Sequence, residues 1–154
     1  AGKYDFIPSI LKKLNVKNYF KGATIRPGKP LTFAKFNNKN VFFGLPGNPI
    51  SSAACFRFFV LPFILNSLEM KKEKPIIARL KNSFKKKNKF TRFIKGKLTI
   101  NKKGVAEFIV LKGQESFRIN SLTKANSWGL FHTGKSYFKK GNFVECYPPV
   151  PFLI

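Results

Sequence analysis

The chain has 154 residues, which is enough for one or two small domains. A hydrophobic fraction of 44% and 19 phenylalanines provide for a buried core and exclude an intrinsically disordered chain. The formal net charge of +24 is the one feature of the composition that favours nucleic-acid binding.

The positive charge is spread along the chain rather than gathered in a binding motif. Only Lys85-Lys86-Lys87 and nearby Lys89 form a cluster, which predicts a loop or hairpin tip. Lys, Asn, Phe and Ile are abundant together, as an AT-rich genome would produce. The sequence has no RNP motif, no zinc-finger spacing and no basic helix with interleaved aromatic residues. A basic nucleic-acid-binding module is therefore kept only as an alternative, and we expect no nucleic-acid partner.

The residue types that bind metals or form disulfides are few. Cys55 and Cys146 lie far apart without a metal-ligand spacing, which predicts reduced thiols in an intracellular, cytoplasmic protein. Cys55 falls in an apolar segment, as a core residue does, and His132 has no partner in a ligand or catalytic pattern. Residues 1–5 are polar, so we expect no signal peptide.

The N-terminal part has the periodicity of a helix followed by strands. Apolar residues at helical spacing predict a helix over residues 5–14. The short mixed segment 16–25 predicts a strand. Residues 31–36 and 41–43 predict two further strands, because the polar segment 37–40 between them is typical of a hairpin turn.

The stretch Gly44-Leu45-Pro46-Gly47-Asn48-Pro49 predicts a strand, a tight turn and the start of a helix. We expect Gly44 and Gly47 to provide a positive φ or a close backbone approach. Asn48 is a good N-cap, and Pro49 suits the first helical position. Such a turn directs free N–H groups and the positive end of a helix dipole at one point, which suits an anion. The alternative is an ordinary connection between a strand and a helix.

The longest apolar run covers residues 50–70 and raises the question of a transmembrane helix. Arg57, Pro62 and Asn66 interrupt the run and favour a buried helix docked on a sheet. Pro62 lacks an N–H group and should kink the helix or mark a local break. We therefore expect no membrane partner.

A charged stretch ending in proline, residues 69–75, predicts a domain boundary. Beyond it the period changes from helical to alternating, with a hairpin turn at 101–104. Several short strands with turns about every ten residues predict a small barrel or sandwich. The expected strands are 76–80, 90–94, 97–100, 105–111 and 143–147.

Several motifs together resemble the molybdopterin molybdenumtransferase family, which includes the MoeA-type enzymes and the E domain of gephyrin. The family carries [KR]-P-G-K-P, a short hairpin and G-L-P-G-N-P-[VI]-S, which match Arg26-Pro27-Gly28-Lys29-Pro30 and the run from Gly44 to Ser51. Gly2-Lys3-Tyr4-Asp5 looks like the end of the family's S-G-G-x-S-x-G-x-x-D run. Its later Q-G-S…S-S-[LF]…A-N segment matches Gln114-Glu115-Ser116, Ser121-Leu122 and Ala125-Asn126, so the resemblance covers nearly the whole chain.

The resemblance implies an α/β fold followed by an all-β C-terminal barrel. Residues 1–72 would form the C-terminal half of the α/β molybdopterin-binding domain, and residues 73–154 would form the barrel. In the family the α/β domain begins well before the aspartate, so we expect the chain to be a fragment that does not synthesise molybdenum cofactor by itself. We also expect the full-length protein to be a homodimer.

The resemblance further implies the reaction. The family inserts molybdate into adenylylated molybdopterin and releases molybdenum cofactor and AMP, with Mg²⁺ as the assisting metal. All of these substrates are anions, so their site needs fixed positive charge, backbone donors and a carboxylate for the metal.

The matching positions give a candidate site. Asp5 would be a catalytic residue and the metal ligand, although the residues alone favour a simple helix cap for it. Lys21 and Arg26 would be the catalytic cations. Substrate and molybdate would be bound by Lys29, Pro46, Gly47, Asn48, Pro49, Ser51, Arg92 and Ser116. We expect the oxyanion where Arg26, the turn at 46–49, Arg92 and Ser116 converge, although each cation alone is more typical of a solvated surface.

Two departures from the family pattern bear on this site. Glu115 replaces the family's glycine and adds a negative charge, and the spacing from Lys21 to the turn is one residue longer. The alternative function is a non-catalytic scaffold that binds a partner, as gephyrin's E domain does. The presence of Asp5, Arg92 and Ser116 favours the enzyme.

Overall fold

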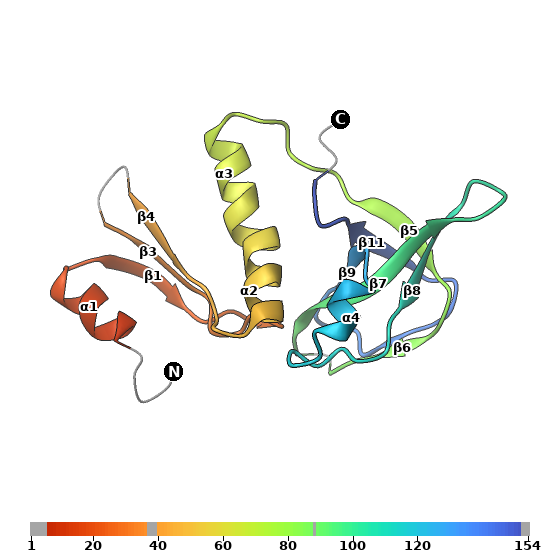
Figure 1. The fold of residues 1–154 in the computed structure, drawn as a ribbon, viewed down its shortest axis with the longest axis horizontal. Helices are drawn as coiled ribbons and strands as arrows, with labels where there is room; N and C mark the ends of the chain where they lie inside the picture. Colours follow the sequence, from red (N-terminus) through yellow and green to blue (C-terminus); the bar gives the residue numbers. More distant parts are fainter. Residues whose placement is uncertain (1–5, 37–39, 88, 152–154) are drawn as a thin grey trace.

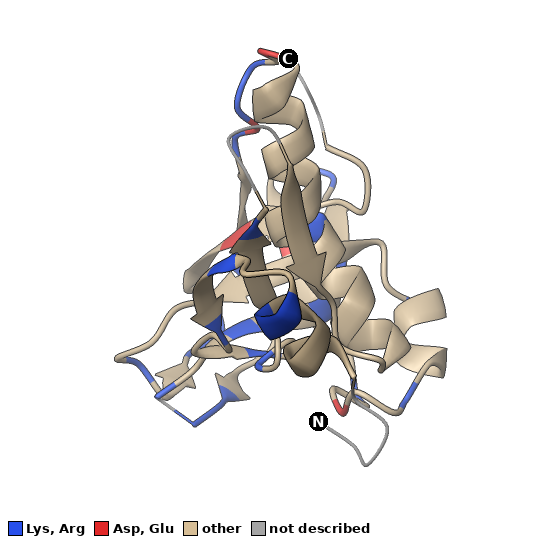
Figure 2. Cartoon of the chain, turned by 90° about the vertical axis from the view of Figure 1, so that its left-hand side faces the viewer, with Lys and Arg blue, Asp and Glu red and all other residues tan. Residues whose placement is uncertain are grey.

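The computed structural model describes residues 6–36, 40–87 and 89–151. Figure 1 shows two parts on either side of a long helix: a small sheet with a short helix on one side, and a closed barrel on the other. The lysines and arginines are distributed over both parts (Figure 2), as their dispersion in the sequence predicts.

The small sheet has three antiparallel strands in the order β1-β3-β4. The predicted helix, strand and hairpin are confirmed, and the turn residues 37–39 lie outside the described residues. Pro8 sits in the first turn of the helix, where its missing N–H costs little. The elements are α1 (Ile7–Lys13), β1 (Lys17–Lys21), β3 (Thr32–Lys35) and β4 (Val41–Gly44).

The tight turn after β4 leads directly into α2 (Pro49–Cys55), with Asn48 as its N-cap, as the sequence predicts. Of the two roles expected for Gly44 and Gly47, positive φ is found at neither, and a close approach is found only at Gly44. A Cβ at Gly44 would lie 3.2 Å from the Phe42 ring, which is a close approach, whereas Gly47 faces open space. The proline at the helix start, rather than glycine, fixes the turn.

The long helix is interrupted where proline predicts it. Between α2 and α3 (Leu61–Ser67) lies a π-helical turn, η1 (Phe56–Val60), and Pro62 occupies the first turn of α3. A proline cannot donate to the preceding turn, so the hydrogen-bond ladder shifts there.

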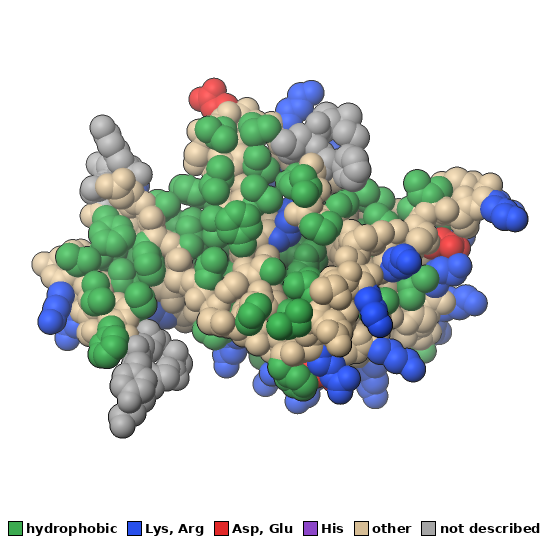
Figure 3. Space-filling view, viewed as in Figure 1, with side chains coloured by type: hydrophobic (Ala, Val, Ile, Leu, Met, Phe, Trp, Pro, Cys, Tyr) green, Lys and Arg blue, Asp and Glu red, His purple; other side chains and the backbone are tan. Residues whose placement is uncertain are grey.

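The long helix is buried at its start and exposed at its end. The apolar face of α2 is buried, but no residue of α3 is, so the predicted burial is wrong for α3. Figure 3 shows the hydrophobic side chains over α3 at the surface. The run Pro49–Ser67 is long and apolar enough by composition to cross a membrane, with 28% of its most apolar window buried. Arg57 interrupts it with a buried guanidinium that pairs with Glu73 at 2.6 Å.

The second part is the predicted all-β barrel. Five strands close in the order β7-β8-β5-β11-β9 and back to β7, and all pairs are antiparallel except β5 with β8. The barrel strands are β5 (Ile76–Leu80), β7 (Thr91–Ile100), β8 (Ala106–Val110), β9 (Ser127–Phe131) and β11 (Phe143–Tyr147). Outside the barrel lie the pair β6 (Phe84–Lys85) and β10 (Tyr137–Phe138) and the short helix α4 (Asn120–Thr123).

The prediction of two strands over 90–100 is wrong, because β7 runs through Gly96 without a break. The ring of Phe108 packs on this glycine, and a Cβ there would lie 2.0 Å from it. Strand β9 escaped prediction because Ser127, Trp128 and Gly129 are all buried, which leaves no alternating pattern. The expected loop at Lys85–Lys87 is wrong for Lys85, which lies in β6, whereas Lys86 and Lys87 lie outside the strands and Lys86 is buried.

The two parts are joined by a short strand, β2 (Ile25–Arg26), which pairs in parallel with the start of β7. Residues on opposite faces of β7 enter different cores, since Ile94 lies inside the barrel and Phe93 packs toward α2. Phe93 stacks on Phe58 with ring centroids 4.1 Å apart. The boundary between units at residues 72–75 stays a prediction.

Candidate functional site

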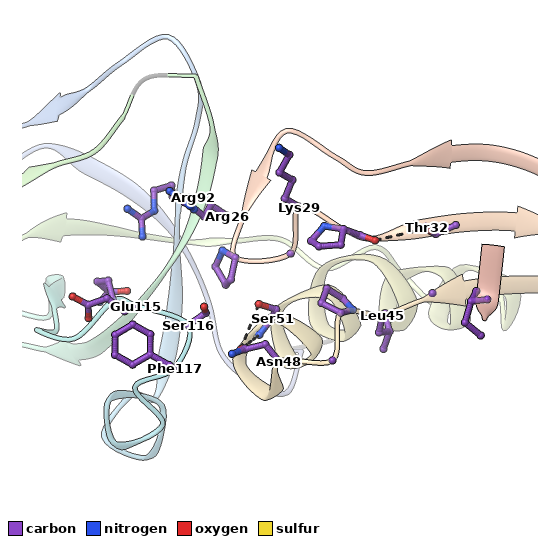
Figure 4. Close-up of a pocket in the computed structure, with 18 of the residues that line it drawn as sticks. Arg26, Lys29, Thr32, Leu45, Asn48, Ser51, Arg92, Glu115, Ser116 and Phe117 are labelled. Carbon is purple, nitrogen blue, oxygen red and sulfur yellow. Dashed lines mark hydrogen bonds between the residues drawn. The ribbon is translucent and has the colours of Figure 1, made fainter. Parts of the chain in front are cut away.

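A cavity of about 920 Å³ lies between the two parts of the molecule. Figure 4 shows its two walls, which we call the α/β wall and the barrel wall. The α/β wall comprises residues 26–30, Thr32, residues 44–48 and Ser51, with Ile7 and Pro8 at its edge. The barrel wall comprises Arg92 and residues 114–117.

The structure brings most of the sequence-predicted site residues to this cavity. Those that line it are Arg26, Lys29, Pro46, Gly47, Asn48, Ser51, Arg92 and Ser116. Lys21 and Pro49 are not among the lining residues, and the side chain of Lys21 is exposed on β1. Asp5 lies outside the described residues.

The shape of the α/β wall around Arg26 and Lys29 depends on Gly28. This residue has a φ of +113°, in the left-handed region, and a Cβ there would lie 2.6 Å from the sulfur of Cys55 in α2. Its carbonyl accepts a hydrogen bond from Leu31 N at 3.0 Å. Glycine therefore lets this segment turn tightly against α2 and leaves the side chains of Arg26 and Lys29 exposed.

The turn before α2 uses up the donors that the sequence seemed to offer. Asn48 Oδ1 accepts hydrogen bonds from the backbone N–H groups of Ile50 at 3.1 Å and Ser51 at 3.2 Å. The residue between, Pro49, has no N–H group. The prediction that this helix start gives free N–H groups to an anion is therefore wrong for its first three positions.

The barrel wall holds a buried donor without a partner. Among the described residues, Arg92 Nε is a buried side-chain nitrogen with no hydrogen-bond acceptor. Burial and, next, the charge of Arg26 lower the pKa of Arg92, while Glu115 opposes this effect. The backbones of Arg26 and Arg92 are paired in register, and in Figure 4 both side chains lie at the cleft. Two guanidinium groups this close repel each other unless an anion lies between them.

The loop at residues 114–117 completes the barrel wall. In Figure 4, Ser116 lies at the edge of the barrel wall nearest Ser51. Glu115 pairs with Arg118 at 3.3 Å, and its side chain is 52% exposed. The sequence reasoning missed Phe117, which lines the cleft and is 72% exposed, because a lone aromatic residue carries no pattern.

The candidate metal ligands are sparse in the part of the chain that the structure describes. There, no group of three or more His, Cys, Asp or Glu side chains could hold a metal ion. His132 lies 3.6 Å from Glu145, away from the cleft. The predicted metal ligand, Asp5, lies outside the described residues, so its role stays a prediction.

The two cysteines do not take part in the chemistry of the cleft. Both are buried free thiols, as the sequence predicts. Burial raises the pKa of Cys55 to about 11 and that of Cys146 to about 12. At neutral pH both therefore stay protonated and unreactive.

Family models match both parts of the chain. Residues 1–66 match the probable molybdopterin binding domain, and residues 77–148 match the MoeA C-terminal region, domain IV. The molybdopterin molybdenumtransferase of Synechocystis sp. is 34% identical over 128 residues, covering 75% of this chain and 30% of that protein. The enzyme of that name from Staphylococcus epidermidis is 32% identical over 148 residues, covering 94% of this chain and 35% of that protein.

Solved structures share the fold. The molybdopterin biosynthesis MoeA protein from Pyrococcus horikoshii matches with a TM-score of 0.73 and 25% identity, covering 96% of this chain and 36% of that one. A molybdenum cofactor biosynthesis protein from Pyrococcus furiosus matches with a TM-score of 0.70 at 22% identity, over 94% of this chain and 54% of that one. The chain spans about a third of the length of the curated relatives.

Proposed function

We propose that this chain, which belongs to the family of MoeA-type molybdopterin molybdenumtransferases, acts in molybdenum cofactor biosynthesis. We further propose that its cleft binds molybdate for insertion into adenylylated molybdopterin. The observation that carries this proposal is the unpartnered, buried Nε of Arg92, at the cleft that Arg26 also lines. A tetrahedral dianion offers acceptors to both guanidinium groups at once.

The described residues bind and orient two anionic reactants. Arg92 from the barrel wall and Arg26 from the α/β wall hold the oxyanion by charge-assisted hydrogen bonds, and the hydroxyl of Ser116 donates from the barrel wall. Lys29, an exposed cation in the same segment of the α/β wall as Arg26, would bind the phosphate groups of the pterin substrate. Positive charge on both walls reduces the repulsion between molybdate and a phosphorylated partner, which is the main obstacle to bringing them together.

Magnesium forms part of the same proposal. Asp5 would hold it, and the bound cation would neutralise charge on the two linked phosphates, one of which leaves in AMP. The residues of the described cleft contribute their one carboxylate, Glu115, which is tied to Arg118. Formation of the whole active site, and turnover, belong to the full-length protein, and we propose that the 154 residues alone bind the oxyanion without completing the transfer.

Calorimetric titration of the chain with molybdate tests the proposal. Arg92→Ala should weaken binding by about 1.5–3 kcal/mol, the worth of hydrogen bonds to a charged group. Lys97→Ala is the matched control, because Lys97 is an exposed cation on the same strand and does not line the cleft. Equal affinity in the wild-type chain and Arg92→Ala would show that the oxyanion site lies elsewhere.

A further inference from the structure

A lysine that the sequence does not single out is buried behind the barrel wall. Lys95 lies in the middle of β7, and its side chain is 1% exposed. Its Nζ donates to the backbone carbonyls of Gly113 at 2.9 Å, Glu115 at 3.2 Å and Arg118 at 3.5 Å. The ammonium group therefore binds both ends and the middle of one loop, residues 113–118.

The backbone of the same lysine is bound to the same loop. Lys95 N donates to Gln114 Oε1 at 3.0 Å, and Gln114 Nε2 donates to Lys95 O at 2.7 Å. Gln114 Nε2 also reaches Leu111 O at 2.7 Å. Ser121 adds a second support, because its hydroxyl contacts the carbonyls of Gly113 at 2.6 Å and Arg118 at 2.7 Å. Lys95 and Ser121 therefore hold the 113–118 loop from outside it, and Gln114 ties it to β7 from within.

This loop carries all the residues of the barrel wall except Arg92. Glu115, Ser116 and Phe117 all line the cleft, and in Figure 4 Ser116 lies between Glu115 and Ser51. Loops without regular structure hold a side chain less firmly than strands do, so the supports behind them decide how well the side chain is placed. Loss of those supports would let Ser116 move away from Arg92.

We propose that Lys95 is a positioning residue for oxyanion binding: its ammonium group fixes the 113–118 loop, and its buried charge strengthens the attraction of the cleft for an anion. This inference rests on the function proposed above. Its chemical basis is that three carbonyl oxygens satisfy the hydrogen bonds of an ammonium group but leave its net charge in place.

The electrostatics of the neighbourhood agree with this role. The pKa of Lys95 is lowered by burial first and by Arg92 as well, while Glu115 raises it. Lys95 and Arg92 therefore repel each other through the interior of the protein, where charges are screened less than at the surface. A bound dianion would reduce this repulsion between Lys95 and Arg92. Support of the loop alone requires no charge, since a neutral amide could also donate hydrogen bonds to carbonyl groups.

Three substitutions separate the two roles of the side chain. Lys95→Met removes donors and charge, Lys95→Gln keeps two of the three N–H donors on a side chain one atom shorter and removes the charge, and Lys95→Arg keeps both donors and charge. Lys97→Met is the control, as an exposed lysine two positions along β7. Trp128 is the single tryptophan, and it is buried on β9 opposite Lys95. Its fluorescence emission reports whether each variant is folded.

Two measurements test the proposal on the full chain. Amide hydrogen exchange, followed by mass spectrometry, compares a peptide covering residues 112–121 with one covering β8. Calorimetry measures the dissociation constant for molybdate. Lys95→Met should raise exchange in the loop but not in β8 and weaken molybdate binding about 10- to 100-fold. Lys95→Gln should keep more of the loop protection yet bind molybdate more weakly than wild type, and Lys95→Arg should restore both.

The outcomes distinguish this inference from the proposed function. Wild-type loop exchange and wild-type affinity in a folded Lys95→Met variant would overturn it. If Lys95→Met does not fold, the Gln and Arg variants decide, because equal molybdate affinity in these two would refute the role of the charge. If the wild-type chain binds no molybdate, the proposed function fails, while loop exchange still decides whether Lys95 holds the loop.

Discussion

The two walls of the cleft are built by different means. The α/β wall is shaped by its backbone, through the left-handed Gly28 and the Asn48 cap before α2. The barrel wall is shaped by buried side chains, with Lys95 and Ser121 holding the loop that carries Ser116. Residues that are close together in the sequence determine most of the α/β wall. The barrel wall requires residues that come into contact only after the barrel has closed.

The walls also differ in how they present charge. Arg26 and Lys29 are exposed cations, whose attraction for an anion is screened by water and salt. Arg92 and Lys95 are partly or fully buried, and burial lowers the pKa of each. The α/β wall should therefore attract anions over distance, and the barrel wall should supply most of the binding free energy.

The largest effect should come from the backbone of the α/β wall. Gly28→Ala places a Cβ 2.6 Å from the buried sulfur of Cys55 at a φ of +113°. Backbone strain and overpacking together should lower the free energy of unfolding by about 2–5 kcal/mol. Urea denaturation, followed by Trp128 emission, measures the loss.

The matched control for this substitution is Gly104→Ala. Gly104 has a φ of +75°, but a Cβ there meets no atom within 4 Å. Its cost should be limited to about 1–2 kcal/mol of backbone strain. Similar losses in the two variants would show that contact with Cys55 does not shape the α/β wall.

These particular residues explain how far the sequence could predict the molecule. The capped helix start at Asn48 and the hairpin before it follow from local rules, and the alternating period after residue 75 predicts the barrel. The motifs also predict the residues that meet at the cleft, including Arg92 and Ser116. Their roles in binding stay predictions.

What the sequence could not predict depends on tertiary contacts. In the sequence, Lys95 cannot be distinguished from the many other cations. Only the closed barrel buries it against the carbonyl groups of a loop about 20 residues away. Continuity of β7 through Gly96 depends on the ring of Phe108, which arrives from another strand. The exposed α3 face is a third case, since an apolar pattern does not state which surface covers it.

A smaller effect should follow from removing the cap of α2. Asn48→Ala deletes the acceptor for the N–H groups of Ile50 and Ser51, which should cost about 0.5–2 kcal/mol of stability. Asn48→Asp is the informative partner variant, because it keeps the acceptor and adds a negative charge to the cleft. We expect Asn48→Asp to retain stability and to weaken molybdate binding. Equal stability of the alanine variant and wild type would show that the cap does not hold this wall.

The smallest effect concerns the acidic residue of the barrel wall. Glu115 places a negative charge beside Arg92, and its charge acts on the pKa of Arg92 in the opposite direction to Arg26. Its side chain is about half exposed and paired with Arg118, so water screens much of its field. Glu115→Gln keeps the size of the side chain and removes the charge. It should tighten molybdate binding by about 0.2–1 kcal/mol, the worth of an exposed charge pair. The gain should shrink as salt is added, because the charge is exposed.

Glu107→Gln is the control, since Glu107 lies on β8 with Lys81 and does not line the cleft. Weaker binding by Glu115→Gln would instead mean that the carboxylate assists the anion, as it would through a shared cation, and the barrel wall would then be more than a cradle of positive charge.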